Sequence, residues 1–278
     1  MRCNGRQGAS VTTDICQTME LHFAKWHGTG NDFILIDDRN GSFPVSDEIV
    51  RRLCDRHFGV GSDGLILVQV PRQDGTRFHM EFFNPDASRS FCGNGSRCAF
   101  AFWSGLNDAA SSAAFTAIDG VHQGEWRKEL VAITLRDVAE IIRGSDGSEV
   151  DFVQNGSPHE LVWVDDPGSV AIMKDGPRRR NAPAHAPGGT NVNFLRARNG
   201  VVEMRTYERG VEAETMSCGT GVVAAALSAL VRGQAQAPVA VRTPGGTLSV
   251  EALLNGDGAS HLCLIGPVAE VFTGTITI

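Results

Sequence analysis

The feature that most constrains the fold is a duplicated motif in which Cys-Gly-polar-Gly stands directly before an apolar stretch. The first copy is Cys92-Gly-Asn-Gly, and an apolar helix is predicted after it over Ser96–Trp103. The second copy is Cys218-Gly-Thr-Gly, and an apolar helix is predicted after it over Val222–Val231. A helix that is apolar nearly all round has to be buried. The repeat therefore predicts two similar halves, each with a helix at its centre.

Short strand-like segments punctuated by Gly, Asn and Asp surround both helices. The strands expected in the first half are 21–26, 33–37, 65–70, 78–83, 115–118 and 130–135, with a loop at 27–32 and a helix from the cap Ser46 to Asp55. Those expected in the second half are 161–164, 201–206, 239–242, 247–252 and 261–265, with a basic, Pro- and Gly-rich loop at 177–189. This predicts an α+β fold of two pseudo-symmetric domains, each a curved, mostly antiparallel sheet or barrel around a central helix.

The length and the charge narrow the organisation and the partners. A chain of 278 residues suits two domains, which we predict at 21–137 and 138–267 after a polar extension over 1–20. The net charge of −7 argues against a nucleic-acid partner, which requires a basic surface. The longest nearly apolar run, 221–231, is too short to span a bilayer, so no membrane association is expected.

The cysteines are typical of reduced thiols. They number seven, their spacing is irregular, and no CxxC pair is present. This composition predicts neither a disulfide framework nor a structural zinc site, and no metal is expected. With no signal-peptide pattern at the N-terminus, a cytoplasmic location is expected. Cys54, Cys98 and Cys263 lie within apolar patterns and are predicted to be buried.

The chemistry of the paired motifs follows from their position. A thiol at a helix N-terminus meets unpaired backbone N–H groups and the positive end of the helix dipole, which should lower its pKa. The adjacent glycines let a carboxylate approach the same N–H groups. If the two helix ends meet, one thiolate can remove an α-proton while the opposite thiol delivers one. This scheme requires no cofactor. The alternative is that both cysteines are inert, buried side chains.

Several weaker signals allow two interpretations each. Gly59-Val-Gly-Ser-Asp-Gly64 satisfies GxGxxG but lies between a helix and a strand, so a glycine-rich turn is favoured over a dinucleotide site. Asn31, Asn84 and Asn191 are either turn residues or ligand-binding amides. His159 is either structural or functional. Glu208 and Arg209 form either a surface pair or, through Arg209, a clamp for a carboxylate. Arg178-Arg-Arg180 is expected to be a solvated loop face.

Together these segments resemble the diaminopimelate epimerase family, which works without pyridoxal phosphate. The resemblance runs from about Leu21 to Ile278. It is carried by His27-Gly-Thr-Gly-Asn-Asp-Phe33, Arg56–Gly64, Phe83-Asn-Pro-Asp86, Cys92–Cys98, Gly156-Ser-Pro-His159, Asn191-Val-Asn-Phe194, Tyr207-Glu-Arg-Gly210 and Cys218-Gly-Thr-Gly221. It implies two pseudo-symmetric domains with the active site in the cleft between them. It also implies a homodimer that interconverts LL- and meso-2,6-diaminopimelate for lysine and cell-wall precursor synthesis.

The resemblance also implies roles for individual residues. Cys92 and Cys218 match the two catalytic cysteines, and His159 and Glu208 match residues that tune the thiols and contact substrate. The positions that match substrate-binding residues are Asn31, Asn84, Gly93, Asn94, Ser157, Asn191, Glu208, Arg209, Gly219 and Thr220. Ser157 stands where many members have Asn, and Gly64 where some have Gln. Residues 268–278 are expected to complete the first domain.

Three alternatives remain open at this point. The first is a racemase of another amino acid on the same scaffold. The second is a cysteine hydrolase or transferase that uses one cysteine with His159 as the base. The third is a non-enzymatic protein that binds anions at the same N–H groups.

Overall fold

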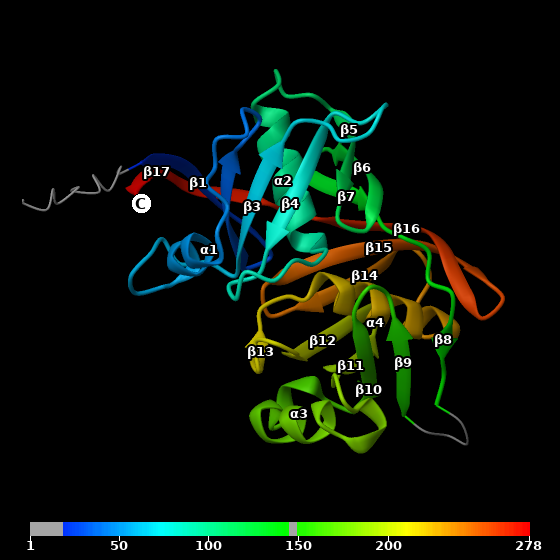
Figure 1. Ribbon diagram of the computed structural model, residues 1–278. Coiled ribbons are helices and arrows are strands. Elements are labelled where there is room, and N and C mark those ends of the chain that lie inside the picture. Colours follow the sequence, from blue (N-terminus) through cyan, green and yellow to red (C-terminus); the bar gives the residue numbers. More distant parts are fainter. Residues whose placement is uncertain (1–18, 145–148) are drawn as a thin grey trace, which may run out of the picture.

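The computed structural model describes residues 19–144 and 149–278, which form mostly strands (Figure 1). The first half contains β1 (Glu20–Gly28), β2 (Asn31–Asp37), α1 (Asp47–Cys54), β3 (Gly64–Gln69), β4 (Phe78–Phe83), α2 (Gly93–Gly105), β5 (Ser112–Ala117), β6 (Gly120–Arg127) and β7 (Leu130–Thr134). The second half contains β8 (Ile141–Ile142), β9 (Val150–Gln154), β10 (Pro158–Trp163), α3 (Ile172–Arg180), β11 (Asn191–Arg198), β12 (Val201–Glu208), β13 (Ala213–Thr215), α4 (Gly219–Val231), β14 (Val239–Thr243), β15 (Gly246–Asn255) and β16 (Gly258–Gly266). The last strand is β17 (Ala269–Thr277).

The strand pairing shows the internal repeat directly. In the first half, β2 and β3 are parallel, β3 and β4 antiparallel, β4 and β5 parallel, and β5, β6 and β7 antiparallel. In the second half, β10, β11, β12, β14, β15 and β16 follow the same sequence of pairings. In each half the long apolar helix lies in the connection that leads to the second parallel pair. The predicted pseudo-symmetric, mostly antiparallel fold is therefore confirmed.

The two halves are joined into one continuous sheet. The last strands of the two repeats, β7 and β16, pair with each other in antiparallel fashion. The strand that follows them, β17, returns to the first half and pairs with β1 along its length. Figure 1 shows β1 and β17 side by side at the edge of the first half. The domain boundaries at 137 and 267 remain predictions.

In each half the strands surround the long helix (Figure 1), and the two helices lie in separate hydrophobic cores. The core around α2 is rich in aromatic side chains, and Phe78 stacks between Trp103 and Phe115. The core around α4 consists mainly of Val, Ala and Leu. Both helices are buried on nearly every side, as their composition predicts. Because each helix is held by the strands of its own half, its N-terminus has a defined position.

Several local predictions are confirmed. Ser46 caps α1 by accepting a hydrogen bond from the Ile49 N–H at 3.2 Å. Cys54, Cys98 and Cys263 are all buried. The glycine-rich segment that ends at Gly64 bends between α1 and β3, as expected, and Gly64 begins β3.

Three local predictions are wrong. The loop expected at 27–32 shrinks to residues 29 and 30, because β1 and β2 continue their pairing up to Gly28 and Asn31. Part of the basic loop expected at 177–189 is helical, since α3 extends to Arg180 and a short 3-10 turn covers Pro183–His185. The third wrong prediction is that Arg178–Arg180 forms a solvated loop face. These residues lie in the last turn of α3, where Arg179 pairs with Glu160 and Arg180 with Glu212.

Packing explains why α3 forms despite its Gly and Pro. Gly176 lies against the Tyr207 ring so closely that a Cβ there would come 2.5 Å from Cγ of that ring. Ile172 is buried with Tyr207 and Phe194 in a small apolar cluster. Burial of this face outweighs the low helix propensity of Gly176 and Pro177.

The extension predicted over 1–20 falls almost wholly outside the described residues. Of its positions, only Met19 and Glu20 are described. Met19 exchanges backbone hydrogen bonds with Ile278, and Glu20 begins β1.

Candidate active site

The two duplicated motifs come together at the N-termini of α2 and α4. Cys92 is the N-cap residue of α2, and Cys218 is the N-cap residue of α4. A Cβ on Gly219 would lie 3.2 Å from the backbone nitrogen of Asn94. The Asn94 amide donates a hydrogen bond to the carbonyl of Ser217 at 3.1 Å. The starts of the two helices are therefore in direct contact, although they belong to different halves.

The Cys92 sulfur lies among backbone donors and a side-chain amide. It accepts a hydrogen bond from the Gly95 N–H at 3.3 Å and lies 3.9 Å from Oδ1 of Asn31. Burial raises the pKa of Cys92 to about 11, although the Gly95 and Asn94 N–H groups and Arg97 act in the opposite direction. The negative charge of Glu208 raises it further.

Cys218 is more deeply buried than Cys92. Its sulfur lies 3.6 Å from the Thr220 hydroxyl. Burial and the nearby Glu208 raise the pKa of Cys218, while Thr220 and the Gly221 N–H lower it by less. The prediction that the helix ends lower the thiol pKa values is therefore wrong for this state of the protein. Desolvation of the thiolates outweighs the helix-end N–H groups.

The raised pKa makes a testable prediction for Cys92. The rate of its alkylation by iodoacetamide should rise about tenfold per pH unit from pH 7 to pH 10, because only the thiolate reacts and its pKa lies above this range. Mass spectrometry of the peptide that contains Cys92 measures the rate. An unstructured peptide of the same sequence, with an ordinary thiol pKa, should level off near pH 9. A plateau for the folded protein below pH 9 would contradict the prediction.

Glu208 lies at the end of β12 beside the second thiol. Its carboxylate accepts a hydrogen bond from the Thr215 hydroxyl at 2.7 Å and lies within hydrogen-bonding reach of Cys218. Burial raises the pKa of Glu208, and the negative charge of Asp63 from the first half adds to this. A half-buried carboxylate with a raised pKa next to a thiol is well suited to exchange a proton with it.

His159 is completely buried on β10, and one side chain, that of Thr220, separates it from the Cys218 thiol. Its Nε2 lies 2.9 Å from the Thr220 hydroxyl, and its Nδ1 lies 3.3 Å from the Asn193 amide. Burial and the positive charge of Arg209 lower the pKa of His159 to about 3, so the ring is neutral. The same Thr220 hydroxyl contacts Cys218, and His159 therefore reaches that thiol through Thr220.

The predicted asparagines differ in their surroundings. Asn31 joins the site, because its Oδ1 accepts a hydrogen bond from Asn94 at 3.2 Å and its Nδ2 donates one to Asp63 at 2.8 Å. Asn84 lies in the loop before α2, where its amide donates to Ser88 and Ser90. These contacts favour its interpretation as a turn residue.

Asn191 organises the distal side of the site. Its Nδ2 donates to the Ser157 hydroxyl at 2.8 Å and to the Pro158 carbonyl at 3.0 Å. Its Oδ1 accepts a hydrogen bond from the backbone N–H of Arg209 at 2.8 Å. Asn191 thus links Ser157 to Arg209, and both ends of its amide are engaged. The Arg209 side chain itself is exposed.

The sequence interpretation missed an ionic network at Asp32 and Asp63. Arg56 bridges the two carboxylates at 2.7 Å each, and the buried Lys25 pairs with Asp32 at 2.6 Å. Asp63 lies in a segment that was predicted to be a glycine-rich turn, and Asp32 lies in the loop predicted at 27–32. Neither prediction indicated an ion pair. Two amides were missed as well. The half-buried Asn155 donates to the Thr220 carbonyl, and the buried Asn193 contacts His159. No local pattern marks these residues.

This network predicts an acid-dependent contribution to stability. Burial would raise the pKa of Asp32, but hydrogen bonds from Arg56 and Lys25 outweigh it and lower the pKa to about 2. Its contribution is therefore present above about pH 4, the unfolded pKa, and is lost as the pH falls through about 2. We expect D32N to lower the free energy of unfolding by about 2 kcal/mol at pH 7 and by much less at pH 2.

Urea denaturation at the two pH values measures this effect. The matched control is D37N, which removes a more exposed carboxylate paired with Arg39 and should change stability by under about 0.5 kcal/mol. An equal loss for D32N at pH 7 and pH 2 would contradict the assignment.

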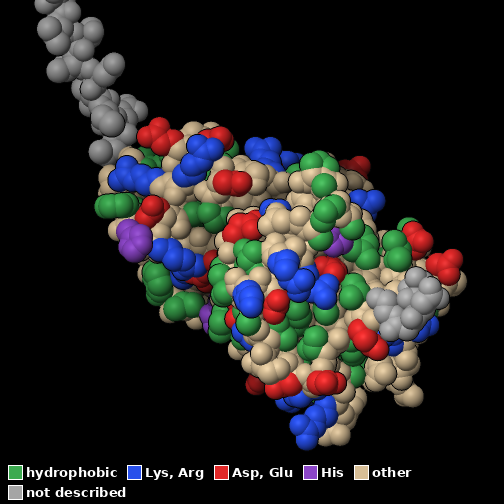
Figure 2. Space-filling view, turned by 90° about the horizontal axis from the view of Figure 1, so that it is seen from below, with side chains coloured by type: hydrophobic (Ala, Val, Ile, Leu, Met, Phe, Trp, Pro, Cys, Tyr) green, Lys and Arg blue, Asp and Glu red, His purple; other side chains and the backbone are tan. Residues whose placement is uncertain are grey.

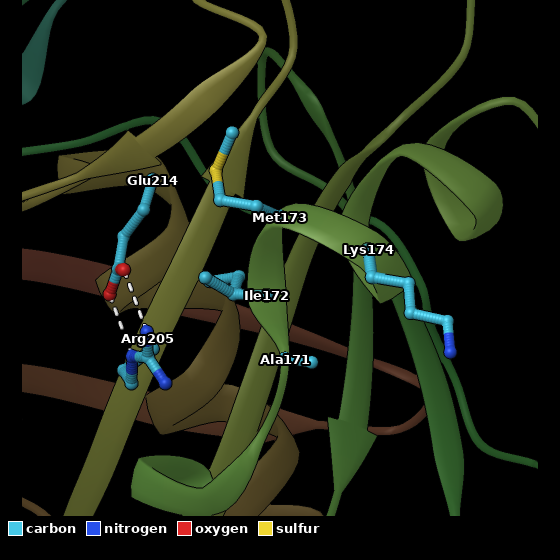
Figure 3. Close-up of a pocket in the computed structure, with 6 residues that line it drawn as sticks. All are labelled: Ala171, Ile172, Met173, Lys174, Arg205 and Glu214. Carbon is cyan, nitrogen blue, oxygen red and sulfur yellow. Dashed lines mark hydrogen bonds and ion pairs between the residues drawn. The ribbon is translucent and has the colours of Figure 1, made fainter.

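The remaining structural observations concern surfaces and ligand groups. A shallow pocket beside α3 is lined by Ala171, Ile172, Met173, Lys174, Arg205 and Glu214, and it contains none of the predicted site residues (Figure 3). Two of its charged groups, Arg205 and Glu214, pair with each other.

Basic and acidic side chains are interspersed on the face shown in Figure 2. Within residues 19–144 and 149–278, no cluster of three His, Cys, Asp or Glu residues could hold a metal, and no helix is long and apolar enough to cross a bilayer.

With its two repeats and paired helix starts, the chain has the two-repeat fold of racemases and epimerases. A hydroxyproline epimerase from Agrobacterium vitis has a similar structure, with a TM-score of 0.70, 16% identity and 93% of each chain covered. A phenazine biosynthesis protein of the PhzF family from Bacillus anthracis has a TM-score of 0.72 at 11% identity, with 94% of this chain and 100% of that chain covered. These distant neighbours support the fold alone.

The sequence comparisons identify the family. The profile described as diaminopimelate epimerase matches residues 23–135 and 152–269. A diaminopimelate epimerase from Flavobacterium psychrophilum is 35% identical over 91% of this chain and 98% of its own length. One from Aquifex aeolicus is 36% identical over 92% of this chain and 98% of its own length. The chain belongs to the diaminopimelate epimerase family.

Proposed function

We propose that this chain interconverts LL- and meso-2,6-diaminopimelate by inverting one α-carbon, as a step in lysine and cell-wall precursor synthesis. The observation that carries the proposal is the contact between the two helix starts that present Cys92 and Cys218. Family membership and the names of the relatives supply the substrate. The reaction class follows from the chemistry that two opposed thiols can perform.

The proposed mechanism is a two-base proton transfer. One sulfur, as thiolate, removes the α-hydrogen as a proton, and the thiol on the other face of the carbon delivers a proton. Backbone N–H groups at Gly93-Asn94 and Gly219-Thr220 hold the reacting carboxylate and stabilise the enediolate that develops on it. Glu208 exchanges a proton with Cys218, which compensates for the raised thiol pKa. The transfers need only these groups, and we expect no cofactor.

The distal amino-acid group of the substrate is proposed to lie near Arg209. The guanidinium of Arg209 has no hydrogen-bond or ion-pair partner among the described residues, so it is available for a carboxylate. Asn191 and Ser157 hold the backbone beside it. At Gly64 the Phe82 ring fills the adjacent space, so no side-chain contact to substrate arises there.

The assembly and the location are part of the same proposal. We propose a homodimer in the cytoplasm. Val271 and Phe272 of β17 are about half exposed, which leaves apolar surface available to a second copy. The free thiols of the site suit a reducing compartment. Light scattering on the purified protein should give twice the monomer mass.

The structure does not favour the hydrolase alternative. A cysteine hydrolase requires a base in hydrogen-bond contact with its nucleophile. His159 instead contacts Thr220 and Asn193, and its lowered pKa makes it a weak base.

The deciding experiment uses reduced protein, LL-diaminopimelate and deuterium oxide without added cofactor. The expected result is meso product with one deuterium at the inverted α-carbon. Product formation without deuterium, or no exchange by folded and reduced protein, would overturn the mechanism. Equal turnover of an amino acid that lacks the distal carboxylate would favour the broader racemase alternative.

A further inference from the structure

Arg97 is a completely buried arginine directly behind the first cysteine motif. Its guanidinium donates hydrogen bonds to Oδ1 of Asn94 at 2.9 Å and to the Gly93 carbonyl at 3.4 Å. Its Nε has no hydrogen-bond partner. Within the part of the chain that the structure describes, no carboxylate pairs with it. A charge buried without a counter-charge is costly, so its retention calls for an explanation.

The other buried or half-buried lysines and arginines among the described residues are paired with carboxylates. Lys25 pairs with Asp32, and Arg232, at the far end of α4, pairs with Asp151. Arg97 differs, and the space around it is shaped to receive it. A Cβ on Gly28 would lie 3.0 Å from one of its terminal nitrogens, and a Cβ on Gly266 would lie 3.3 Å from its Nε. Glycine at these two positions leaves room for the guanidinium.

Arg97 also sets the direction of a chain of hydrogen bonds. A guanidinium can only donate, so Oδ1 of Asn94 faces it and Nδ2 of Asn94 faces away. That Nδ2 donates to the Asn31 side chain and to the Ser217 carbonyl in the other half. Nδ2 of Asn31 then donates to Asp63, which can only accept. Each amide therefore has one permitted orientation, and Oδ1 of Asn31 is directed towards the Cys92 sulfur.

We propose that Arg97 is a positioning residue whose uncompensated buried charge stabilises the Cys92 thiolate and the substrate carboxylate, and whose guanidinium orients Asn94 and Asn31. The carboxylate part rests on the proposed function, whereas the thiolate part does not. The titratable groups that interact with Cys92 are Arg97, the carboxylate of Glu208 and the thiols of Cys98 and Cys218. Arg97 is the cation of this set. Burial lowers its pKa to about 10, so it remains charged at neutral pH.

The test measures the thiolate directly and without substrate. Iodoacetamide alkylation of Cys92 at pH 8.5 is followed by mass spectrometry in the full-length protein. R97M should slow the alkylation about tenfold, which corresponds to a rise of one unit in the Cys92 pKa. R97K, which keeps the charge, should stay within about threefold of the wild-type rate. The control is R178M, which removes an exposed arginine of α3 and should leave the rate unchanged.

The outcomes separate the charge from a merely structural role. Wild-type alkylation of folded R97M would overturn the proposal, and so would R97K behaving like R97M. If R97M does not fold, R97Q takes its place, because its amide can still donate to Asn94 without carrying charge. Since alkylation requires no substrate, its result stands even if diaminopimelate is not turned over. In active protein, kcat/KM should fall about 100-fold in R97M and much less in R97K.

Discussion

Replacement of either Cys92 or Cys218 by alanine should lower epimerase turnover by about 1,000-fold or more. Each variant removes one of the two groups that must act on opposite faces of the α-carbon, and general acid–base groups contribute about 10²–10⁴ to a rate. Coupled assay of meso product from the LL isomer, and of the reverse reaction, measures the loss. C263A provides the control, because Cys263 is a buried thiol on β16 outside the site.

The two cysteine variants should also differ from each other in a defined way. The sulfur that remains faces only one side of the substrate. Any exchange of the α-hydrogen with deuterium oxide that a variant retains should therefore be confined to one stereoisomer, and to opposite isomers in C92A and C218A. A folded variant that keeps a near-wild-type rate would refute the role of that cysteine.

The second large effect is expected at Arg209. R209A should raise KM for diaminopimelate about 100-fold with a smaller change in kcat, because a charge-assisted, bidentate contact to the distal carboxylate would be lost far from the reacting carbon. Its guanidinium lies on the exposed side of the site, and its backbone is held by Asn191. Steady-state kinetics of the purified variant measure both constants. R178A removes an exposed arginine of α3 and should leave both constants unchanged.

A substrate control makes the Arg209 prediction specific. An analogue without the distal carboxylate should be a poor substrate of the wild-type protein, and R209A should not impair its turnover further. An equal loss of kcat/KM for both compounds would mean that Arg209 maintains the structure of the site and does not bind the distal carboxylate.

Structural features that depend on residues close in the sequence were predicted correctly. The motifs at Cys92 and Cys218 predicted buried helices that start at the cysteines, and both cysteines occupy the N-cap positions of α2 and α4. The helix cap at Ser46 was likewise predicted correctly, because capping involves only the next three residues. The buried positions of Cys54, Cys98 and Cys263 followed from apolar patterns around them. The family resemblance then supplied a list of site residues that local patterns alone left ambiguous.

Residues whose behaviour depends on distant parts of the chain were missed or misjudged. The helix-end argument predicted lowered thiol pKa values, but burial by both halves raises the pKa of both thiols. Pro177 and the glycines that follow it predicted a loop from residue 177, but the contact of Gly176 with Tyr207 on β12 supports a helix up to Arg180. Arg97 lay within the motif that carried the prediction, yet a charged side chain in a sequence does not reveal that it will be buried without a counter-charge.

The sequence by itself determined that this chain has two similar halves, that each encloses an apolar helix, and that each helix starts at a cysteine. Those properties arise from periodicity, caps and composition, which act over a few residues. Only the tertiary structure decided that Asn94 meets Ser217, 123 residues away, that β17 returns to β1, and that the thiols are desolvated. The physical reason is that these contacts depend on the packing of both cores together, and no short segment carries that information.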